Sequence, residues 1–116
     1  MPLISLKTSI KVPENKREAL LANMSKIVSE ATGKPEQYIM AIVENTDFML
    51  GGHPGMAAFA EVRGIGGINR EVNGKISEKL CALLESRLEI SPERVYINFI
   101  DIPAENWGWN GSTFGG

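Results

Sequence analysis

The order of hydrophobic and polar residues predicts a strand, a helix and a second strand in the first part of the chain. Residues 2–8 mix apolar and polar positions as a strand does, and Val12-Pro13-Glu14-Asn15 supplies a turn and an acidic first helical turn. An apolar stripe with the helical period follows and ends at Gly33 and Pro35; it consists of Leu20, Leu21, Met24, Ile27, Val28 and Ala31. Residues 38–43 are almost continuously apolar. This run predicts a strand that is covered on both faces or lies in the interior of a sheet.

The same order recurs in residues 57–102. Residues 57–62 predict a strand, Gly64-Ile65-Gly66-Gly67 a turn, Asn69 a helix cap and residues 95–100 a last strand. The helical stripe between them consists of Ile76, Leu80, Leu83, Leu84 and Leu88. Two β-α-β units of similar length predict one α/β (α+β) domain over residues 1–116, with a four-stranded sheet and both helices on one face.

The sheet face opposite the helices then needs a cover. A sheet rich in Ile, Val and Phe exposes more apolar surface than a monomer tolerates, so we expect another copy of the chain to cover it. Residues 107–114 place large aromatic side chains between glycines in a segment too short to fold as a unit. We expect this tail to dock on a neighbouring copy.

Composition narrows the classes of partner. The chain has 116 residues, a net charge of -2 and a pI of about 5.4, so it lacks the broad basic field that nucleic acid or an anionic membrane requires. No segment approaches the roughly 18 apolar residues of a membrane span, and the first residues lack the features of a signal peptide. A single cysteine, Cys81, fits a reducing compartment. We therefore expect a cytoplasmic protein.

Pro2 is the most unusual candidate for chemistry. A methionine followed by a small residue is a good substrate for initiator removal, which would leave Pro2 with a free secondary amine. An α-amino group titrates near pH 8, and burial or a neighbouring cation lowers its pKa, so such an amine suits general-base catalysis at neutral pH. The structural alternative is that Pro2 begins an edge strand, where its missing N–H costs little.

Other candidates have equally plain alternatives. Lys34 follows a helix end, where it either interacts with the helix dipole or binds a substrate carboxylate and lowers the pKa of a nearby amine. The turn at Ile65 either is a plain tight turn or offers backbone N–H groups to a small carboxylate. Tyr96 and Asn98 share one strand face and point either into a site or to a polar sheet edge.

Metal and thiol chemistry have little support in the sequence. His53 is the only histidine and has no Cys, Asp or Glu at ligand spacing, so we expect it in a solvated loop and predict no metal site. Cys81 adjoins the apolar stripe of the second helix, where a core thiol is expected and a nucleophile is not.

Five motifs occur along the chain: Met1-Pro2; Ala31-Thr32-Gly33-Lys34-Pro35 with Gln37-Tyr38-Ile39; Ile65-Gly66-Gly67; Ile90-Ser91-Pro92 with Arg94-Val95-Tyr96-Ile97-Asn98; and Gly108-Trp109-Asn110-Gly111-Ser112-Thr113-Phe114. Together they closely resemble the macrophage migration inhibitory factor and D-dopachrome tautomerase family. The likeness runs through the whole chain.

The resemblance implies a trimer with active sites between subunits and an isomerase that needs no cofactor. In the family, the N-terminal proline shuttles a proton between carbon and oxygen of an α-keto acid such as phenylpyruvate, or acts on dopachrome-like substrates. By motif, Pro2 is the base, Lys34 and the backbone of Ile65 hold the carboxylate, and Tyr96 and Asn98 come from the next subunit. The wall around the aromatic end of the substrate is expected to consist of Tyr38, Trp107, Trp109 and Phe114.

Two departures from the family pattern affect function. The animal members carry a Cys-x-x-Cys pair where this chain has Ala57-Ala58-Phe59-Ala60, so we expect no thiol–disulfide activity. Trp107 replaces a smaller aliphatic residue, which predicts a narrower or more aromatic pocket. The alternative function is cytokine-like binding of a receptor with a vestigial pocket, although nothing in the sequence supports a receptor. A third is dehalogenation or decarboxylation by the same proline.

Overall fold

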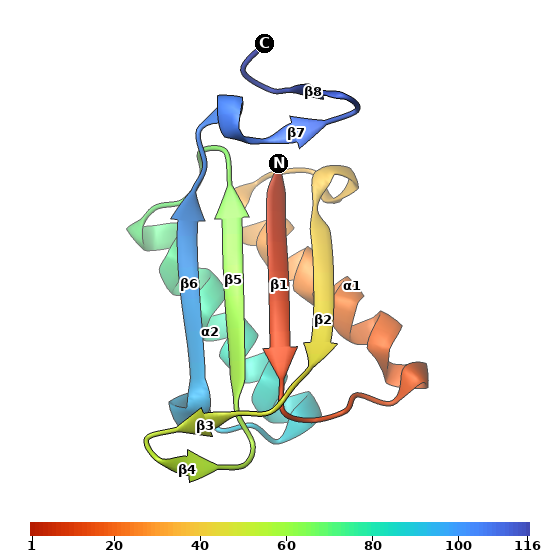
Figure 1. Cartoon of the computed structure of the whole chain (residues 1–116), viewed down its shortest axis with the longest axis vertical. Helices are drawn as coiled ribbons and strands as arrows, with labels where there is room; N and C mark the ends of the chain where they lie inside the picture. The colour runs from red at the N-terminus through yellow and green to blue at the C-terminus, as the bar shows by residue number, and fades with distance from the viewer.

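Four strands form one mixed sheet in the order β2-β1-β5-β6 (Figure 1). The computed structural model describes residues 1–116 and gives β1 as Pro2–Thr8, β2 as Met40–Asn45, β5 as Ala58–Gly64 and β6 as Val95–Asp101. The pairs β1–β2 and β5–β6 are parallel, and β1 pairs antiparallel with β5. The two predicted β-α-β units are therefore confirmed, and they join through the antiparallel pair at the centre of the sheet.

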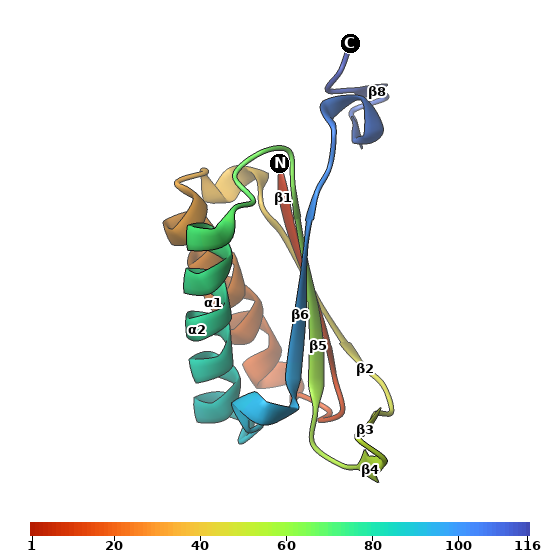
Figure 2. The ribbon, with the colours of Figure 1, turned by 90° about the vertical axis from the view of Figure 1, so that its left-hand side faces the viewer.

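Both long helices pack on one face of this sheet, as predicted (Figure 2). Helix α1 spans Glu14–Thr32 and helix α2 spans Arg70–Leu88. Their stripes face the strand positions that alternate toward the helices, and together they bury a core that includes Ile4, Leu6, Leu20, Met24, Val28, Val62, Ile76, Leu80 and Leu84. Neither helix combines the length and apolar character needed to cross a bilayer.

Strand β2 lies at an edge of the sheet, so the prediction of an interior position for residues 38–43 is wrong. The two central positions belong to β1 and β5, which pair with each other. Ala41 and Val43 pack against the core, whereas Met40 is 62% exposed. Tyr38 belongs to a short 3-10 helix, η1, over Glu36–Tyr38, and the strand begins two residues later.

The sheet face opposite the helices is less apolar than the sequence analysis expected. The strand alternation places polar and charged residues there, including Lys7 and the ion pair of Arg63 with Glu61, whose N–O distance is 2.9 Å. Tyr96 on β6 is 63% exposed. Most apolar strand residues point toward the helices, so this face is a mixed surface and not a bare hydrophobic one.

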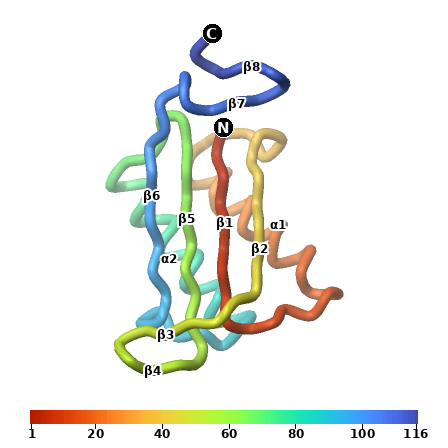
Figure 3. Tube along the Cα trace, in the orientation of Figure 1, coloured from red at the N-terminus to blue at the C-terminus, as the bar shows by residue number.

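Two small hairpins complete the chain, at opposite ends of the molecule (Figure 3). The first joins β3, Met49–Leu50, to β4, His53–Pro54, and the second joins β7, Gly108–Trp109, to β8, Ser112–Thr113. Asn110 and Gly111 both have positive φ, at 52° and 79°, as a two-residue hairpin turn requires. The tail is therefore a short hairpin, which the sequence analysis did not predict, and its docking on a neighbouring copy stays a prediction. Two further 3-10 turns are η2, Pro92–Arg94, and η3, Ala104–Asn106.

The predicted cap at Asn69 has a measurable contribution to stability. Its side-chain oxygen accepts a hydrogen bond from the N–H of Val72 at 2.9 Å. We expect Asn69→Ala to lower the free energy of unfolding by about 1 kcal/mol, because it removes this bond, while Asn69→Asp keeps the cap. Urea titration followed by circular dichroism checks this, and equal midpoints for the two variants would contradict it.

Candidate active site

The end of helix α1 fixes the backbone of Lys34. Gly33 takes the left-handed conformation at φ 75° and closes the helix with an N–H bond to the Ser29 carbonyl. The Ser29 hydroxyl donates to the Lys34 carbonyl at 2.6 Å, and the Lys34 N–H donates to the Thr32 hydroxyl at 3.2 Å. Lys34 is therefore held on both sides before its side chain makes any contact.

The Lys34 side chain extends from the end of α1 to the loop between β5 and α2, where its ammonium binds. Its Nζ donates to the carbonyl oxygens of Ile65 and Gly66 at 2.9 and 2.8 Å. Gly67, at φ 76°, leaves room for it, since a Cβ at this position would lie 3.1 Å from Lys34 Cε. The ammonium does not cap the carbonyls of α1, so the helix-dipole alternative does not describe its contacts.

The same loop has one backbone N–H donor in use and others, including that of Ile65, without a partner. The N–H of Gly66 donates to the carboxylate of Asp101 at 3.0 Å. None of the hydrogen bonds outside the helices and strands uses the N–H of Ile65, which follows the last residue of β5. The Ile65 N–H is therefore free to receive an anion beside the Lys34 ammonium.

A cavity of about 570 Å³ opens beside this cation, within the range of small-molecule sites. Six of its eight lining residues are hydrophobic, and they include residues at the start of the chain and in the C-terminal tail. Figure 1 shows that the start of β1 and the β7–β8 hairpin lie at the same end of the molecule. The lining consists of Met1, Lys34, Pro35, Tyr38, Ile65, Ala104, Trp109 and Phe114. A mostly apolar pocket with one cation suits a flat organic acid.

The chain start reaches this cavity through Met1, with Pro2 buried directly behind it. Burial, and next the positive charge of Lys34, lower the pKa of the Met1 amine below its ordinary value. Pro2 is the first residue of a central strand and pairs with Gly64. The alternative of an edge strand is therefore wrong, although a first strand position also tolerates proline.

Lys34 has opposing influences on its charge. Burial lowers the pKa of its ammonium, while the carboxylate of Asp101 raises it. The two carbonyl bonds favour the charged form in the same way as the carboxylate does. Asp101 was not singled out from the sequence; its only signal is a charged residue at the end of an apolar strand.

Comparison with known proteins shows the family of this chain. The model of the macrophage migration inhibitory factor family matches residues 1–115. The chain belongs to the macrophage migration inhibitory factor family. The resemblance of the five motifs is thereby confirmed.

The similarity to members of the macrophage migration inhibitory factor family extends over nearly the whole chain. The Mus musculus protein is 41% identical over 118 residues, covering 98% of this chain and 99% of its own. The crystal structure of the Prochlorococcus marinus homologue has a TM-score of 0.91 at 35% identity and covers 97% of this chain and 99% of its own. The Toxoplasma gondii protein has a TM-score of 0.93 at 30% identity, with coverages of 97% and 99%.

The aromatic residues expected from the family divide into two groups. Trp109 and Phe114 stack with ring centroids 5.9 Å apart and planes inclined by 11°, and both line the cavity with Tyr38. Trp107 does not line it. Its carbonyl accepts the N–H of Phe114 at 3.1 Å, so within one chain it supports the hairpin and does not narrow the pocket.

Tyr96 and Asn98 lie away from the cavity within one chain. They point from β6 to the open sheet face, opposite Phe59 and Glu61. Asp101 is level with Gly64 and therefore with Pro2, so Asn98 is roughly 10 Å and Tyr96 roughly 17 Å further along the strand. The family assignment of these residues to the pocket stays a prediction that needs a second copy.

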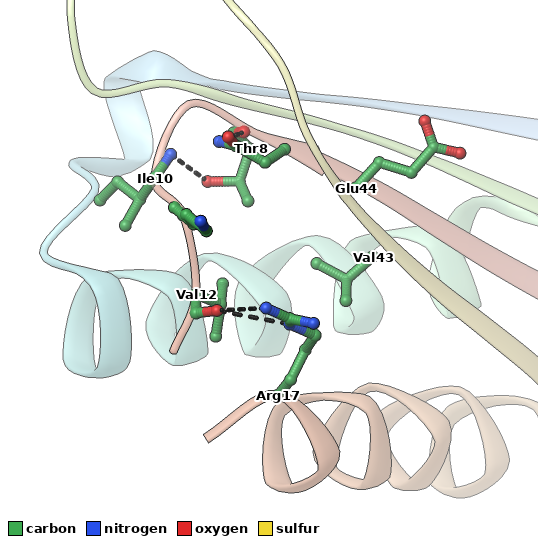
Figure 4. Close-up of a pocket in the computed structure, with 8 residues that line it drawn as sticks. Thr8, Ile10, Val12, Arg17, Val43 and Glu44 are labelled. Carbon is green, nitrogen blue, oxygen red and sulfur yellow. Dashed lines mark hydrogen bonds between the residues drawn. The ribbon is translucent and has the colours of Figure 1, made fainter. Parts of the chain in front are cut away.

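A second cavity, of about 240 Å³, lies at the opposite end of β1 and contains none of the predicted site residues (Figure 4). Thr8, Val43 and Glu44 line it, and Arg17 donates from Nε and Nη2 to the Val12 carbonyl at 3.3 and 3.0 Å. The guanidinium is therefore used to fasten the segment before α1.

The remaining sequence candidates lie outside the first cavity. His53 is exposed in β4, and Cys81 is half-buried on α2. Burial, and next the charge of Glu85, raise the pKa of the Cys81 thiol. No group of three or more His, Cys, Asp or Glu side chains is placed to hold a metal ion.

The coupling between Lys34 and the chain terminus predicts a pKa change. Lys34→Gln removes a positive charge that opposes protonation, so we expect the pKa of the Met1 amine to rise; it stays below the ordinary value because burial remains the larger cause. Carbon NMR titration of protein whose mass shows Met1 retained measures this. Lys26→Gln, on an exposed part of α1, is the control, and equal pKa values in both variants would exclude the coupling.

Proposed function

We propose that this chain is a cofactor-independent keto–enol tautomerase of phenylpyruvate-like α-keto acids, with the amine of Pro2 as general base. The observation that carries the proposal is the meeting of the chain start, the Lys34 ammonium and the free Ile65 N–H at one aromatic-walled cavity. In the structure the Pro2 nitrogen is bonded to Met1, so the chemistry requires removal of Met1.

The base is suited to neutral pH by its surroundings. Removal of Met1 would transfer the terminal amine to Pro2, which is buried, and would keep it on the side of the cavity where Lys34 lies. Both burial and the cation disfavour the protonated amine, as they do for the Met1 amine. A fraction of the proline nitrogen is then unprotonated at pH 7 and able to accept a proton.

The reaction moves one proton within the substrate. In ketonisation the Pro2 nitrogen takes the proton of the enol hydroxyl, the C–O bond becomes a carbonyl, and the resulting ammonium returns a proton to the adjacent carbon. The net change is one O–H bond broken and one C–H bond formed, so no oxidant or cofactor takes part. The charge that develops on oxygen would be stabilised by the Lys34 ammonium and nearby backbone N–H donors.

Substrate orientation follows from the two ends of the cavity. The carboxylate would bind the Lys34 ammonium and the Ile65 N–H, while the aromatic ring would lie against Tyr38 and the Trp109–Phe114 stack. A cation at one end and aromatic rings at the other favour aryl α-keto acids over short aliphatic ones. This arrangement presents the reacting carbon and oxygen to the chain terminus.

A homotrimer would complete the pocket. Tyr96 and Asn98 are exposed on the open sheet face and lie too far along β6 to reach the cavity of their own chain. The open face also carries Arg63 and Glu61, which can pair across an interface as well as within one. A neighbouring copy that covers this face would bring its own polar side chains to the mouth of the pocket.

Replacement of the proposed base is the first test. We expect Pro2→Gly to lower the rate of phenylpyruvate ketonisation roughly 10²–10⁴-fold, the usual cost of losing a general base. The ultraviolet absorbance of the enol measures the rate, in protein whose intact mass shows Met1 removed. Pro13→Gly, before helix α1, is the matched control and keeps wild-type activity.

Two results would contradict the proposal in different ways. Equal activity in Pro2→Gly and wild type would exclude Pro2 as the base while leaving a tautomerase. Correctly processed wild-type protein without any activity would reject the enzyme and favour binding as the function.

The assembly is tested by sedimentation equilibrium. We expect a mass three times the 12.7 kDa of one chain at micromolar concentration. Mixing Tyr96→Ala,Asn98→Ala chains with Pro2→Gly chains tests shared sites, because a mixed trimer would contain some pockets with all three residues and regain activity. A stable monomer with full activity would overturn the shared pocket.

A further inference from the structure

We propose that Asp101 is a positioning residue for the substrate carboxylate: through the N–H of Gly66 it fixes the loop whose carbonyls hold the Lys34 ammonium. This inference rests on the proposed function and adds to it a residue that never touches the substrate. It assigns a role to the one carboxylate that binds the loop beside the cavity.

The geometry forms a short chain of contacts through one glycine. Asp101 ends β6, level with Gly64 at the end of β5. The Oδ1 of Asp101 accepts a hydrogen bond from the Gly66 N–H at 3.0 Å. The carbonyl oxygen of Gly66 in turn accepts a hydrogen bond from Lys34 Nζ at 2.8 Å. One peptide segment therefore links the carboxylate to the ammonium, and a shift of the loop moves both acceptors of Lys34.

The loop needs such a tether because of its composition. Gly66 and Gly67 have φ of 70° and 76°, and glycine loses more conformational freedom on ordering than any other residue. On the strand side, the Ile102 N–H donates to the Gly64 carbonyl at 2.8 Å, which fixes the beginning of the loop. The carboxylate of Asp101 supplies the next fixed point, because it holds the N–H of Gly66, the first glycine of the pair.

The charge of Asp101 acts in the same direction as its hydrogen bond. It forms no ion pair within 4.0 Å, so it is not neutralised by a contact with Lys34. The other titratable groups around the ammonium are the chain-terminal amine and the phenol of Tyr38. Among these groups Asp101 is the one that raises the pKa of Lys34, and it partly offsets the larger lowering by burial.

Three variants separate positioning from general stability. Asp101→Ala removes both the acceptor and the charge, and Asp101→Asn keeps an oxygen acceptor without the charge. Asp47→Ala is the matched control, because Asp47 is the only other aspartate and follows β2 at the opposite end of the sheet. Each is assayed, with Met1 removed, on phenylpyruvate and on its neutral methyl ester.

We expect Asp101→Ala to raise KM for phenylpyruvate about tenfold, as loss of one hydrogen bond to a charged group does, and to change kcat less than about twofold. The methyl ester should show no such change, because it lacks the carboxylate. Asp101→Asn should keep most of the affinity, and Asp47→Ala should match wild type. Equal losses on acid and ester, or a KM for Asp101→Ala equal to that of Asp47→Ala, would overturn the proposal.

A second readout is independent of catalysis. In protein with carbon-13-labelled lysine, the Lys34 signal should titrate at lower pH in Asp101→Asn than in wild type, since the group that raises its pKa is gone. An unchanged titration together with an unchanged KM would reject the role of Asp101. If wild-type protein shows no tautomerase activity while Asp101→Asn still lowers the pKa of Lys34, the proposed function is rejected and the electrostatic coupling of Asp101 to Lys34 stands.

Discussion

The antiparallel pairing of β1 with β5 is the constraint on which the rest of the molecule depends. The two strands within each β-α-β unit are parallel, so both strands start at one end of the sheet and finish at the other end. Joining the units head to tail brings the start of β1 next to the ends of β5 and β6. The chain terminus, the loop after β5 and Asp101 therefore lie together at one end of the sheet, although they are far apart in sequence.

The same pairing also fixes which side chains face the helices. Pro2, Ile4, Leu6 and Thr8 alternate toward the core, level with Gly64, Val62, Ala60 and Ala58. A slip of one residue would turn these side chains to the open face and bring the charged positions into the core. Burial of the core thereby sets the position of the chain terminus, so hydrophobic packing fixes where the terminus lies relative to the cavity.

Much of the fold was predictable because it depends on local periodicity. The helical stripes, the Asn69 cap and the Gly33 stop are all properties of neighbouring residues, and the structure has them where the sequence places them. The edge position of β2 was not predictable in this way, because strand order depends on which strands pair. The tail hairpin does have a sequence signal, the dipeptide Asn110-Gly111, which is typical of a two-residue hairpin turn.

The candidate site residues also divide into those with a local sequence signal and those without one. Lys34 and the Ile65 turn were found from motifs, and the structure brings them together at the cavity, but Asp101 has no motif of its own and is evident only from its contact with Gly66. Tyr96 and Asn98 lie on the open sheet face, away from the cavity of their own chain, so their part in the site stays a prediction that needs a second copy. Residues that act through an assembly or through another residue are the ones that sequence reasoning found hardest to assign.

The β7–β8 hairpin has a consequence for how substrate preference changes in such a protein. It carries Trp109 and Phe114, and it is closed by its own turn, its own strand pair and the bond between Phe114 and Trp107. It contributes no residue to the buried core. The aromatic wall of the cavity is thus separate from the buried core that holds the sheet and helices together, so mutation can change this wall at little cost to stability.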